Sequence, residues 1–88
     1  RREVFRGTDR VDLSRREFDL LALLALHPGR VFERDTILDE IWGEESYVDQ
    51  RTVDVHIRWL RQKIEAAPSS PARLLTVRGV GYKFSDEA

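Results

Sequence analysis

The stretch RTVDVHIRWLRQKI, residues 51–64, decides the fold, because its pattern predicts one amphipathic helix with two different faces. At about 100° per residue, one line along this helix is apolar and is the predicted core face. This line consists of Val53, Ile57, Leu60 and Ile64. The opposite line and its borders mix basic, amide and apolar side chains: Arg51, Val55, Arg58 and Gln62, with Trp59 on the shoulder and Thr52 and Asp54 beside the first turn.

The composition of this outward face suits the major groove of double-stranded DNA, which is wide enough to admit a helix. Arginine donates two hydrogen bonds to guanine, glutamine pairs in the same way with adenine, and valine contacts the methyl group of thymine. The alternative is a solvated helix face that carries one stray tryptophan. The residue types on the outward face favour sequence-specific DNA binding over that alternative.

Two more helices are predicted before this one. Ser14 and Glu17 form a capping box that begins a helix over Ser14–Leu26. It is apolar around most of its circumference and is expected to be largely buried. Arg34–Trp42 is predicted to form a two-turn helix that Gly43 ends. Asp49 is a good N-cap for the third helix, which is expected to run over residues 49–67.

Short strands are expected at both ends of the chain. Val4–Arg6 and Val11–Leu13 are predicted to form a hairpin around a turn at residues 7–9. Val31–Phe32 reads as an extended link between the first two helices. After the proline-rich loop at 68–71, residues 73–78 and 82–84 are predicted to form a second hairpin around Gly79 and Gly81.

Length and composition limit the chain to one domain, residues 1–88, with one hydrophobic core. The absence of cysteine excludes disulfides and thiolate metal sites. The longest apolar run, residues 20–26, is far shorter than the roughly 20 residues of a membrane span. No export signal is recognised. We therefore expect a cytoplasmic protein without a membrane partner.

The net charge of −1 conceals a strongly segregated distribution. Residues 51–83 carry seven basic and two acidic side chains, whereas residues 1–50 carry eight basic and twelve acidic ones. A basic half of this kind is the electrostatic footprint of a nucleic-acid-binding protein. On charge alone, a solvated helix face explains it equally well. Arg78, beside two glycines at a predicted hairpin tip, is suited to a narrow minor groove, although an ordinary hairpin has the same sequence features.

Three segments resemble the effector domain of OmpR/PhoB-type response regulators: LSRREFDLL (13–21), RTVDVHIRWLR (51–61) and TVRGVGY (76–82). They cover the chain in the family's order and spacing. The resemblance implies an α+β fold, a winged helix-turn-helix with three helices, a short N-terminal β-hairpin and a C-terminal β-hairpin wing. Residues 49–67 would be the recognition helix in the major groove, and residues 73–84 the wing in the minor groove.

By matched position, the resemblance implies a set of DNA-binding residues. Those at or near bases and phosphates would be Arg51, Thr52, Asp54, Val55 and Arg58. Backbone contacts are expected from Trp42, His56, Arg61, Thr76 and Tyr82, and a minor-groove contact from Arg78. Trp59 and Gln62 complete the expected set from the outward helix face. His56 reads equally well as a structural hydrogen-bonding residue.

The resemblance also implies partners. Two copies are expected to bind direct repeats in promoter DNA as a dimer, whereas the isolated domain is expected to be monomeric. The loop of Glu44, Glu45, Ser46 and Tyr47 is expected to contact RNA polymerase. Transcription would be controlled through phosphorylation, by a sensor kinase of a two-component system, of a receiver domain that this chain lacks.

Two features depart from the family pattern. The family has a four-stranded sheet before its first helix, whereas the sequence before Ser14 suffices for two strands, so we expect a truncated N-terminal sheet. The position of Trp59 is often basic in relatives, and tryptophan cannot form a bidentate bond to a base. The DNA sequence that this chain binds is therefore not expected to be that of a well-known relative.

Two other classes of function compete with DNA binding. Catalysis is disfavoured because His27 precedes a proline, His56 lies beside a basic helix face, and the acidic pairs at 39–40 and 44–45 have no histidine at ligand spacing. We therefore expect no enzyme activity, no catalytic residue, no metal and no cofactor. A winged helix that binds only proteins is the stronger alternative, and negligible affinity for DNA even at low salt would reveal it.

Overall fold

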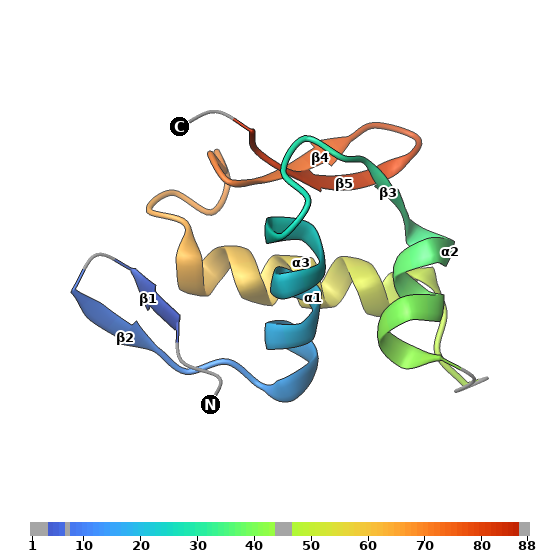
Figure 1. Ribbon diagram of the computed structural model, residues 1–88, viewed down its shortest axis with the longest axis horizontal. Helices are drawn as coiled ribbons and strands as arrows, with labels where there is room; N and C mark the ends of the chain where they lie inside the picture. Colours follow the sequence, from blue (N-terminus) through green and yellow to red (C-terminus); the bar gives the residue numbers. More distant parts are fainter. Residues whose placement is uncertain (1–3, 7, 44–46, 87–88) are drawn as a thin grey trace.

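The computed structural model describes residues 4–6, 8–43 and 47–86, and in these the helices lie between a small hairpin and a separate sheet (Figure 1). The elements follow in the order β1 (Val4–Arg6), β2 (Asp9–Val11), α1 (Arg15–Ala25), β3 (Phe32–Glu33), α2 (Arg34–Ile37), the π-helical segment η1 (Leu38–Trp42), α3 (Gln50–Ile64), β4 (Leu74–Val77) and β5 (Gly81–Phe84). This is the expected α+β arrangement, a winged helix-turn-helix.

Helix α1 begins at the predicted capping box. The Ser14 hydroxyl accepts a hydrogen bond from the Glu17 amide at 3.2 Å, and the Glu17 carboxylate accepts one from the Ser14 amide at 2.8 Å. The expectation of a largely buried helix is wrong. Of its apolar side chains only Leu20 and Leu24 are fully buried, and Leu26 at its C-terminal end is 75% exposed. The reason is that α1 packs against α3, β5 and η1, so the described elements cover one side of it.

The second predicted helix, Arg34–Trp42, is present but is not uniform. An α-helical turn, α2, continues without a break into η1, and Gly43 ends the run with a φ of +62°. The Gly43 amide donates to the carbonyl groups of Leu38 and Asp39, both at 3.1 Å. Ile37 and Trp42 are buried in the core, whereas Leu38 and Ile41 are half-buried at its edge.

Helix α3 begins as predicted, because the Asp49 side chain caps it by accepting from the Arg51 amide at 3.0 Å. The predicted end at Ala67 is wrong: the helix stops at Ile64. Glu65 turns into an extended conformation, and its buried carboxylate accepts from the amides of Ala72, Arg73 and Leu74 at 3.0, 2.8 and 2.7 Å. These three bonds draw the chain away from the helix axis and hold the start of β4.

The N-terminal hairpin is shifted from its prediction. Strand β2 begins at Asp9, not Val11, and pairs antiparallel with β1 in a register that sets Val4 opposite Val11 and Arg6 opposite Asp9. Because β2 begins directly after the turn, it already ends at Val11. The alternating residues 12 and 13, which were predicted to belong to the strand, lie after it. Leu13 instead packs against the hydrophobic core.

The wing is a three-stranded antiparallel sheet in the order β3-β5-β4, because the segment predicted as a link is itself a strand. Phe32 of β3 pairs with Tyr82, and Glu33 with Gly81. A Cβ atom at Gly81 would lie 2.0 Å from the Phe32 carbonyl oxygen, so only glycine allows this close pairing. Strands β4 and β5 otherwise match the predicted hairpin to within one residue at each end.

Candidate nucleic-acid interface

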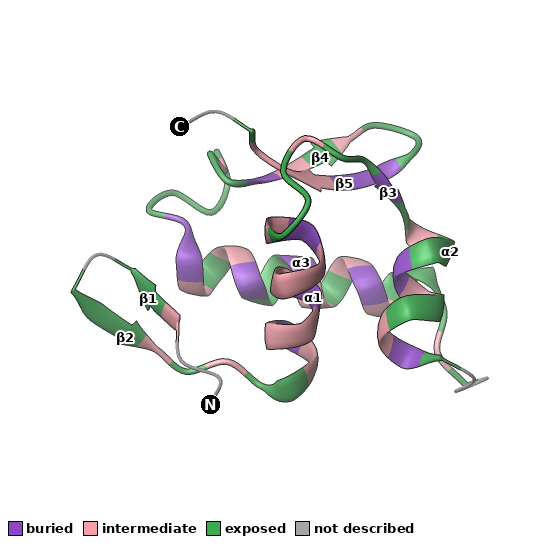
Figure 2. Cartoon of the chain, viewed as in Figure 1, coloured by how far each residue is buried: buried purple, intermediate pink, exposed green. Residues whose placement is uncertain are grey.

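The two faces predicted for α3 are confirmed by burial. The core line of Val53, Ile57, Leu60 and Ile64 is at most 5% exposed. The buried positions recur along α3 in Figure 2, as its helical period requires. On the opposite line the side chains are exposed: Arg51, Val55, Arg58, Trp59 and Gln62. Because one side of α3 is buried in the core, five of the predicted DNA-binding residues are exposed together on its opposite side.

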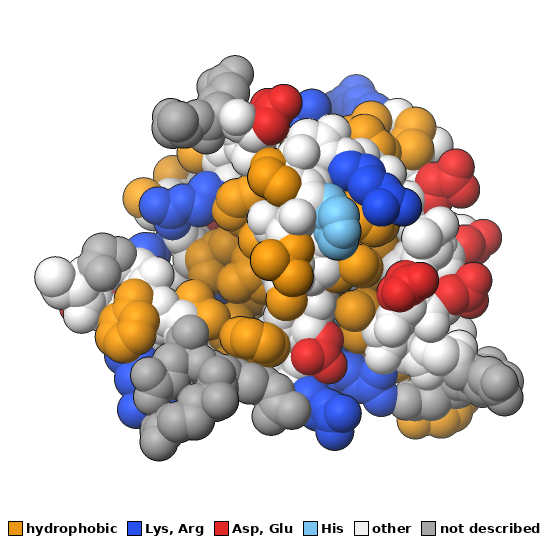
Figure 3. Space-filling view, viewed as in Figure 1, with side chains coloured by type: hydrophobic (Ala, Val, Ile, Leu, Met, Phe, Trp, Pro, Cys, Tyr) orange, Lys and Arg blue, Asp and Glu red, His pale blue; other side chains and the backbone are white. Residues whose placement is uncertain are grey.

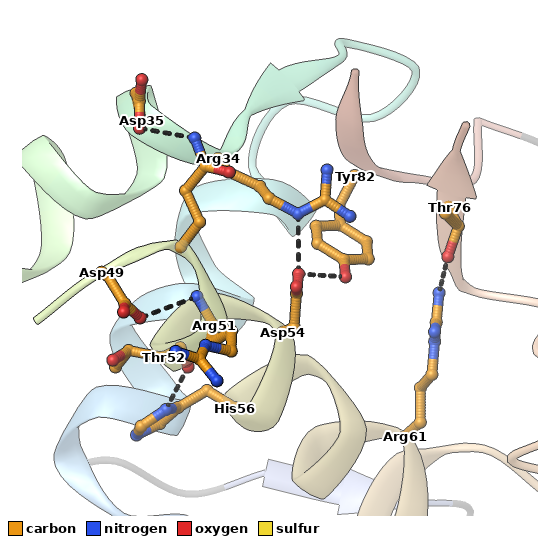
Figure 4. Close-up of polar contacts among 11 residues, drawn as sticks. Arg34, Asp35, Asp49, Arg51, Thr52, Asp54, His56, Arg61, Thr76 and Tyr82 are labelled. Atoms are coloured by element: carbon orange, nitrogen blue, oxygen red, sulfur yellow. Dashed lines mark hydrogen bonds and ion pairs between the residues drawn. The ribbon is translucent and has the colours of Figure 1, made fainter. Parts of the chain in front are cut away.

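Asp54, on the flank of α3 that faces the wing, joins three elements (Figure 4). One oxygen of its carboxylate accepts from Arg34 Nε at 2.8 Å and from the Tyr82 hydroxyl at 2.6 Å. The Arg34 guanidinium also lies over the Tyr82 ring, 5.2 Å from its centroid. Burial, and then the bond to Asp54, raises the pKa of Tyr82 above its ordinary 10.0, and Asp54 raises the pKa of Arg34. Two predicted site residues are therefore neighbours, and both are held by Arg34.

Arg34 is a member of this cluster that the sequence did not indicate. It lies at the start of α2, 20 residues before Asp54. Nothing in its own segment distinguishes it from an ordinary exposed arginine at a helix N-terminus. Only the pairing of β3 with β5 places it beside Tyr82.

Arg61 binds the wing from the same flank of α3. Its guanidinium donates to the Leu74 carbonyl from Nε at 3.1 Å and from Nη2 at 2.8 Å, and Nη2 also donates to the Thr76 hydroxyl at 2.8 Å. It lies 5.6 Å from the centroid of the Tyr82 ring. The structure therefore brings the predicted residues Arg61, Thr76 and Tyr82 together as the joint between α3 and the wing.

On the other flank of α3, three aromatic rings form a row from the core to the surface. Trp42 is 6% exposed and meets the ring of His56 edge-on, with centroids 4.9 Å apart. The His56 ring in turn lies 4.9 Å from that of Trp59, which is 46% exposed. His56 Nδ1 donates to the Thr52 carbonyl at 2.8 Å, which fixes the ring between the two indoles.

The tip of the wing lies at the same end of the molecule as the start of α3 (Figure 1). Gly79 has a φ of +75°, and the Val80 amide closes the turn on the Val77 carbonyl at 3.0 Å. Arg78 is exposed on this turn. A hollow of about 300 Å³ separates the tip from the helices, and it is lined by Glu33, Arg34, Asp35, Gln50, Gly79 and Val80.

The charges around this surface are divided. Among the basic side chains of residues 51–83, Lys63 pairs with Glu17 at 2.7 Å, Arg73 donates to the Ile64 carbonyl at 2.8 Å, and Arg61 holds the wing. Arg51, Arg58 and Arg78 are exposed. Acidic side chains gather at the α2 end of the face shown in Figure 3, and those exposed around α2 are Glu33, Asp35, Asp39 and Glu40.

The loop predicted to contact polymerase is only partly within the described residues. Glu44, Glu45 and Ser46 lie outside them, and Tyr47 is 83% exposed. In the part of the chain that the structure describes, no group of three or more His, Asp or Glu side chains is placed to hold a metal ion. Within the same residues, no helix has the length and apolar character needed to cross a bilayer.

Comparison with known proteins gives one consistent result. Residues 7–84 match the family described as "Transcriptional regulatory protein, C terminal". The chain is 59% identical over 72 residues to the alkaline phosphatase synthesis transcriptional regulatory protein SphR of Synechococcus elongatus, covering 82% of this chain and 28% of SphR. It is 47% identical to the DNA-binding response regulator MtrA of Mycobacterium tuberculosis, covering 92% of this chain and 36% of MtrA. It thus spans about a third of the length of these curated relatives.

Two solved structures of related proteins have the same fold as this chain. The DNA-binding domain of Klebsiella pneumoniae RstA, solved in complex with the RstA box, superimposes with a TM-score of 0.82 at 41% identity, over 96% of this chain and 83% of that one. DrrB of Thermotoga maritima, an OmpR/PhoB homologue, gives a TM-score of 0.81 at 38% identity, over 88% of this chain and 35% of DrrB.

Proposed function

Because the chain belongs to the family of C-terminal DNA-binding domains of OmpR/PhoB-type transcriptional response regulators, we propose that it reads promoter DNA with α3 in the major groove and the wing in the adjacent minor groove. The observation that carries this assignment is the exposed line of α3, where Arg51, Val55, Arg58 and Gln62 face away from a fully apolar core line. These side chains offer the donors, acceptors and apolar surface that base edges in the major groove require.

We assign the remaining predicted residues according to their contacts. Arg51, Arg58 and Arg78 are exposed cations that are available to phosphates or bases, with Thr52 beside them at the start of α3. Asp54, Arg61, Thr76 and Tyr82 hold the wing against α3, and Trp42 and His56 support the other flank. These six set the angle at which the exposed residues meet DNA, and Arg61 and Thr76 also lie close enough to the surface to reach a phosphate.

Binding to duplex DNA is expected to depend on salt in proportion to the number of phosphates neutralised. Three exposed arginines, with Arg61 at their edge, predict three or four contacts and a slope of log affinity on log salt of about −3 to −4. Fluorescence anisotropy of a labelled duplex at several salt concentrations measures this slope. Negligible binding at low salt would instead support a winged helix that binds only proteins.

The partners follow from the same assignment. We propose that two copies bind direct repeats head to tail, that the isolated domain is monomeric, and that phosphorylation of a receiver domain by a sensor kinase controls binding in the longer protein. We also propose that the protein acts in the cytoplasm, because its proposed ligand is DNA. Analytical ultracentrifugation of the domain with and without a two-repeat duplex tests the stoichiometry, and a single copy on that duplex at saturation would contradict it.

We propose further that Glu44, Glu45, Ser46 and Tyr47 contact RNA polymerase, because two acidic residues that follow the acidic residues 39 and 40 in sequence repel DNA and attract a basic protein surface. Changing Glu44 and Glu45 to Lys should abolish activated transcription in a reconstituted assay, while the affinity for the operator stays constant or rises. The same reversal at Asp9 and Asp12, exposed in and after β2, is the control. A parallel fall in operator affinity would show that the loop has a structural role.

A further inference from the structure

Trp59 is the least explained residue on the outward face of α3. Its side chain is 46% exposed, whereas Trp42, the other tryptophan, is buried. Trp59 lies two positions, and therefore about 200° around the helix, from Arg61, which holds the wing. It accordingly belongs to the flank of α3 remote from the wing, and it does not cover the edge of the wing.

The exposed ring is nevertheless held in place. His56 contacts it at 4.9 Å with the two ring planes at 58°, and is itself fixed by its bond to Thr52 and by the buried Trp42. The guanidinium of Arg16 lies 5.5 Å from the Trp42 ring centroid. A large apolar ring that is ordered before binding loses little side-chain entropy when a ligand covers it.

Trp59 also has an apolar neighbour. Val55 precedes it by four residues, so the two side chains lie next to each other on the helix surface, and Val55 is 40% exposed. They line a shallow hollow of about 440 Å³ together with Asp49, Arg51, Thr52 and His56. Val55 lies almost opposite the core line of α3, at the centre of the outward face. The apolar surface of Val55 and Trp59 therefore runs from the centre of that face toward the flank remote from the wing.

We propose that Trp59, with Val55 beside it, reads the 5-methyl group of thymine in the half of the binding site remote from the wing. This inference rests on the proposed docking of α3 in the major groove. Among the base edges exposed there, the thymine methyl is the apolar feature, whereas guanine, adenine and cytosine present donors and acceptors. Indole offers one N–H donor and no acceptor, so it cannot pair bidentately with those bases. Trp59 is thus a specificity-determining residue of this chain.

The test separates a base contact from a backbone contact. Sites are first selected from random duplex DNA with the wild-type domain, and each thymine of the selected site is then replaced by deoxyuridine, which removes the methyl group and keeps the base-pairing edge. At one or two positions remote from the wing contact, the wild-type affinity should fall by about fourfold per methyl group. Trp59→Gln should lower affinity for the thymine duplex and abolish the difference between thymine and deoxyuridine at those positions.

Matched variants complete the design. Val55→Ala should reduce the thymine preference in part, whereas Val31→Ala, the same change at an equally exposed valine outside α3, should leave it unaltered. Trp59→Phe keeps an apolar ring and should retain part of the preference. The melting temperature of each variant is measured in parallel. If Trp59→Gln does not fold, Trp59→Phe and the wild-type deoxyuridine series decide the question.

Several results would overturn the inference. One is a wild-type domain that binds thymine and deoxyuridine duplexes equally at every position, even if Trp59→Gln weakens binding, because the ring would then rest on the sugar-phosphate backbone. Another is a thymine preference that survives in Trp59→Gln. Failure of the proposed function looks different, since the wild-type domain would then select no sequence and bind no duplex at low salt.

Discussion

A single carboxylate oxygen of Asp54 accepts hydrogen bonds from Arg34 of α2 and Tyr82 of β5, so three separate elements depend on one atom. Asp54 lies on α3, the expected recognition helix, and the family resemblance therefore makes it a candidate for DNA contact. In the structure the carboxylate is occupied by the protein's own donors. An acidic side chain beside phosphates is tolerated more easily when two donors, one of them cationic, already bind it.

At the scale of the residue, we expect Asp54→Asn and Tyr82→Phe to be coupled. Asp54→Asn removes the charge from the hydrogen bond with Tyr82, and Tyr82→Phe removes the bond itself. A double-mutant cycle should therefore give an interaction of about 1 kcal/mol, a modest value because the Asp54 side chain is 41% exposed. Urea unfolding of the four proteins measures it. Asp19→Asn, which alters an exposed ion pair with Arg15, should be additive with Tyr82→Phe. Additivity of Asp54→Asn and Tyr82→Phe would contradict the prediction.

The residues that could be predicted from sequence are those whose partners are close in the chain. Ser14 and Glu17 are three positions apart, so a capping box specifies both atoms of each bond. Arg34 is 20 residues from Asp54, and Tyr82 is 28 residues from it. Local patterns carry no information about such contacts, because their geometry exists only after the sheet and α3 have packed together.

At the scale of the element, the wing presents one exposed arginine on a glycine turn. Arg78→Ala should weaken binding by about 1–2 kcal/mol on operators with A·T-rich flanks and by less on G·C-rich flanks, because a narrow minor groove concentrates negative potential. Anisotropy titrations with paired duplexes measure the difference. Lys83→Ala, within β5 of the same hairpin, is the control. Equal losses on both flanks would identify Arg78 as an ordinary phosphate contact.

Elements were predictable where a periodic pattern was long enough. Helix α3 follows from four apolar residues in one line, whereas the two residues of β3 are too few to show any period. The end of α3 was missed for a different reason. The residues 65–67 are acceptable in a helix, and only the amides of residues 72–74, brought back by the loop, favour a different conformation for Glu65.

At the scale of the whole molecule, two buried carboxylates make stability dependent on pH. Burial opposes ionisation of Glu65, but the amides of Leu74, Ala72 and Arg73 outweigh it and lower its pKa below the ordinary 4.5. Burial likewise opposes ionisation of Glu17, whose pKa is lowered by Lys63 and Ser14. Both pKa values are lower in the folded state, so their stabilisation is present above about pH 4.5 and is lost as pH falls through the folded values.

Unfolding free energies between pH 7 and pH 3 should therefore decline on the acid side. Glu65→Gln should cost about 2 kcal/mol at pH 7, because it weakens charged hydrogen bonds in a buried site, and the difference from wild type should shrink as the pH falls below 4.5. Glu40→Gln, at an exposed position, should follow the wild-type curve. A constant difference between Glu65→Gln and wild type at all pH values would contradict the linkage.

The central position of β5 in its sheet has a mechanical consequence. One of its edges pairs with β4 of the wing and the other with β3, which continues directly into α2, and Tyr82 within it is anchored to α3. The wing tip and helix α3 are therefore held at a fixed distance from each other. The DNA has to supply the adjustment, so base steps that change groove spacing at low elastic cost should be enriched between the two contact points, at positions that no side chain touches.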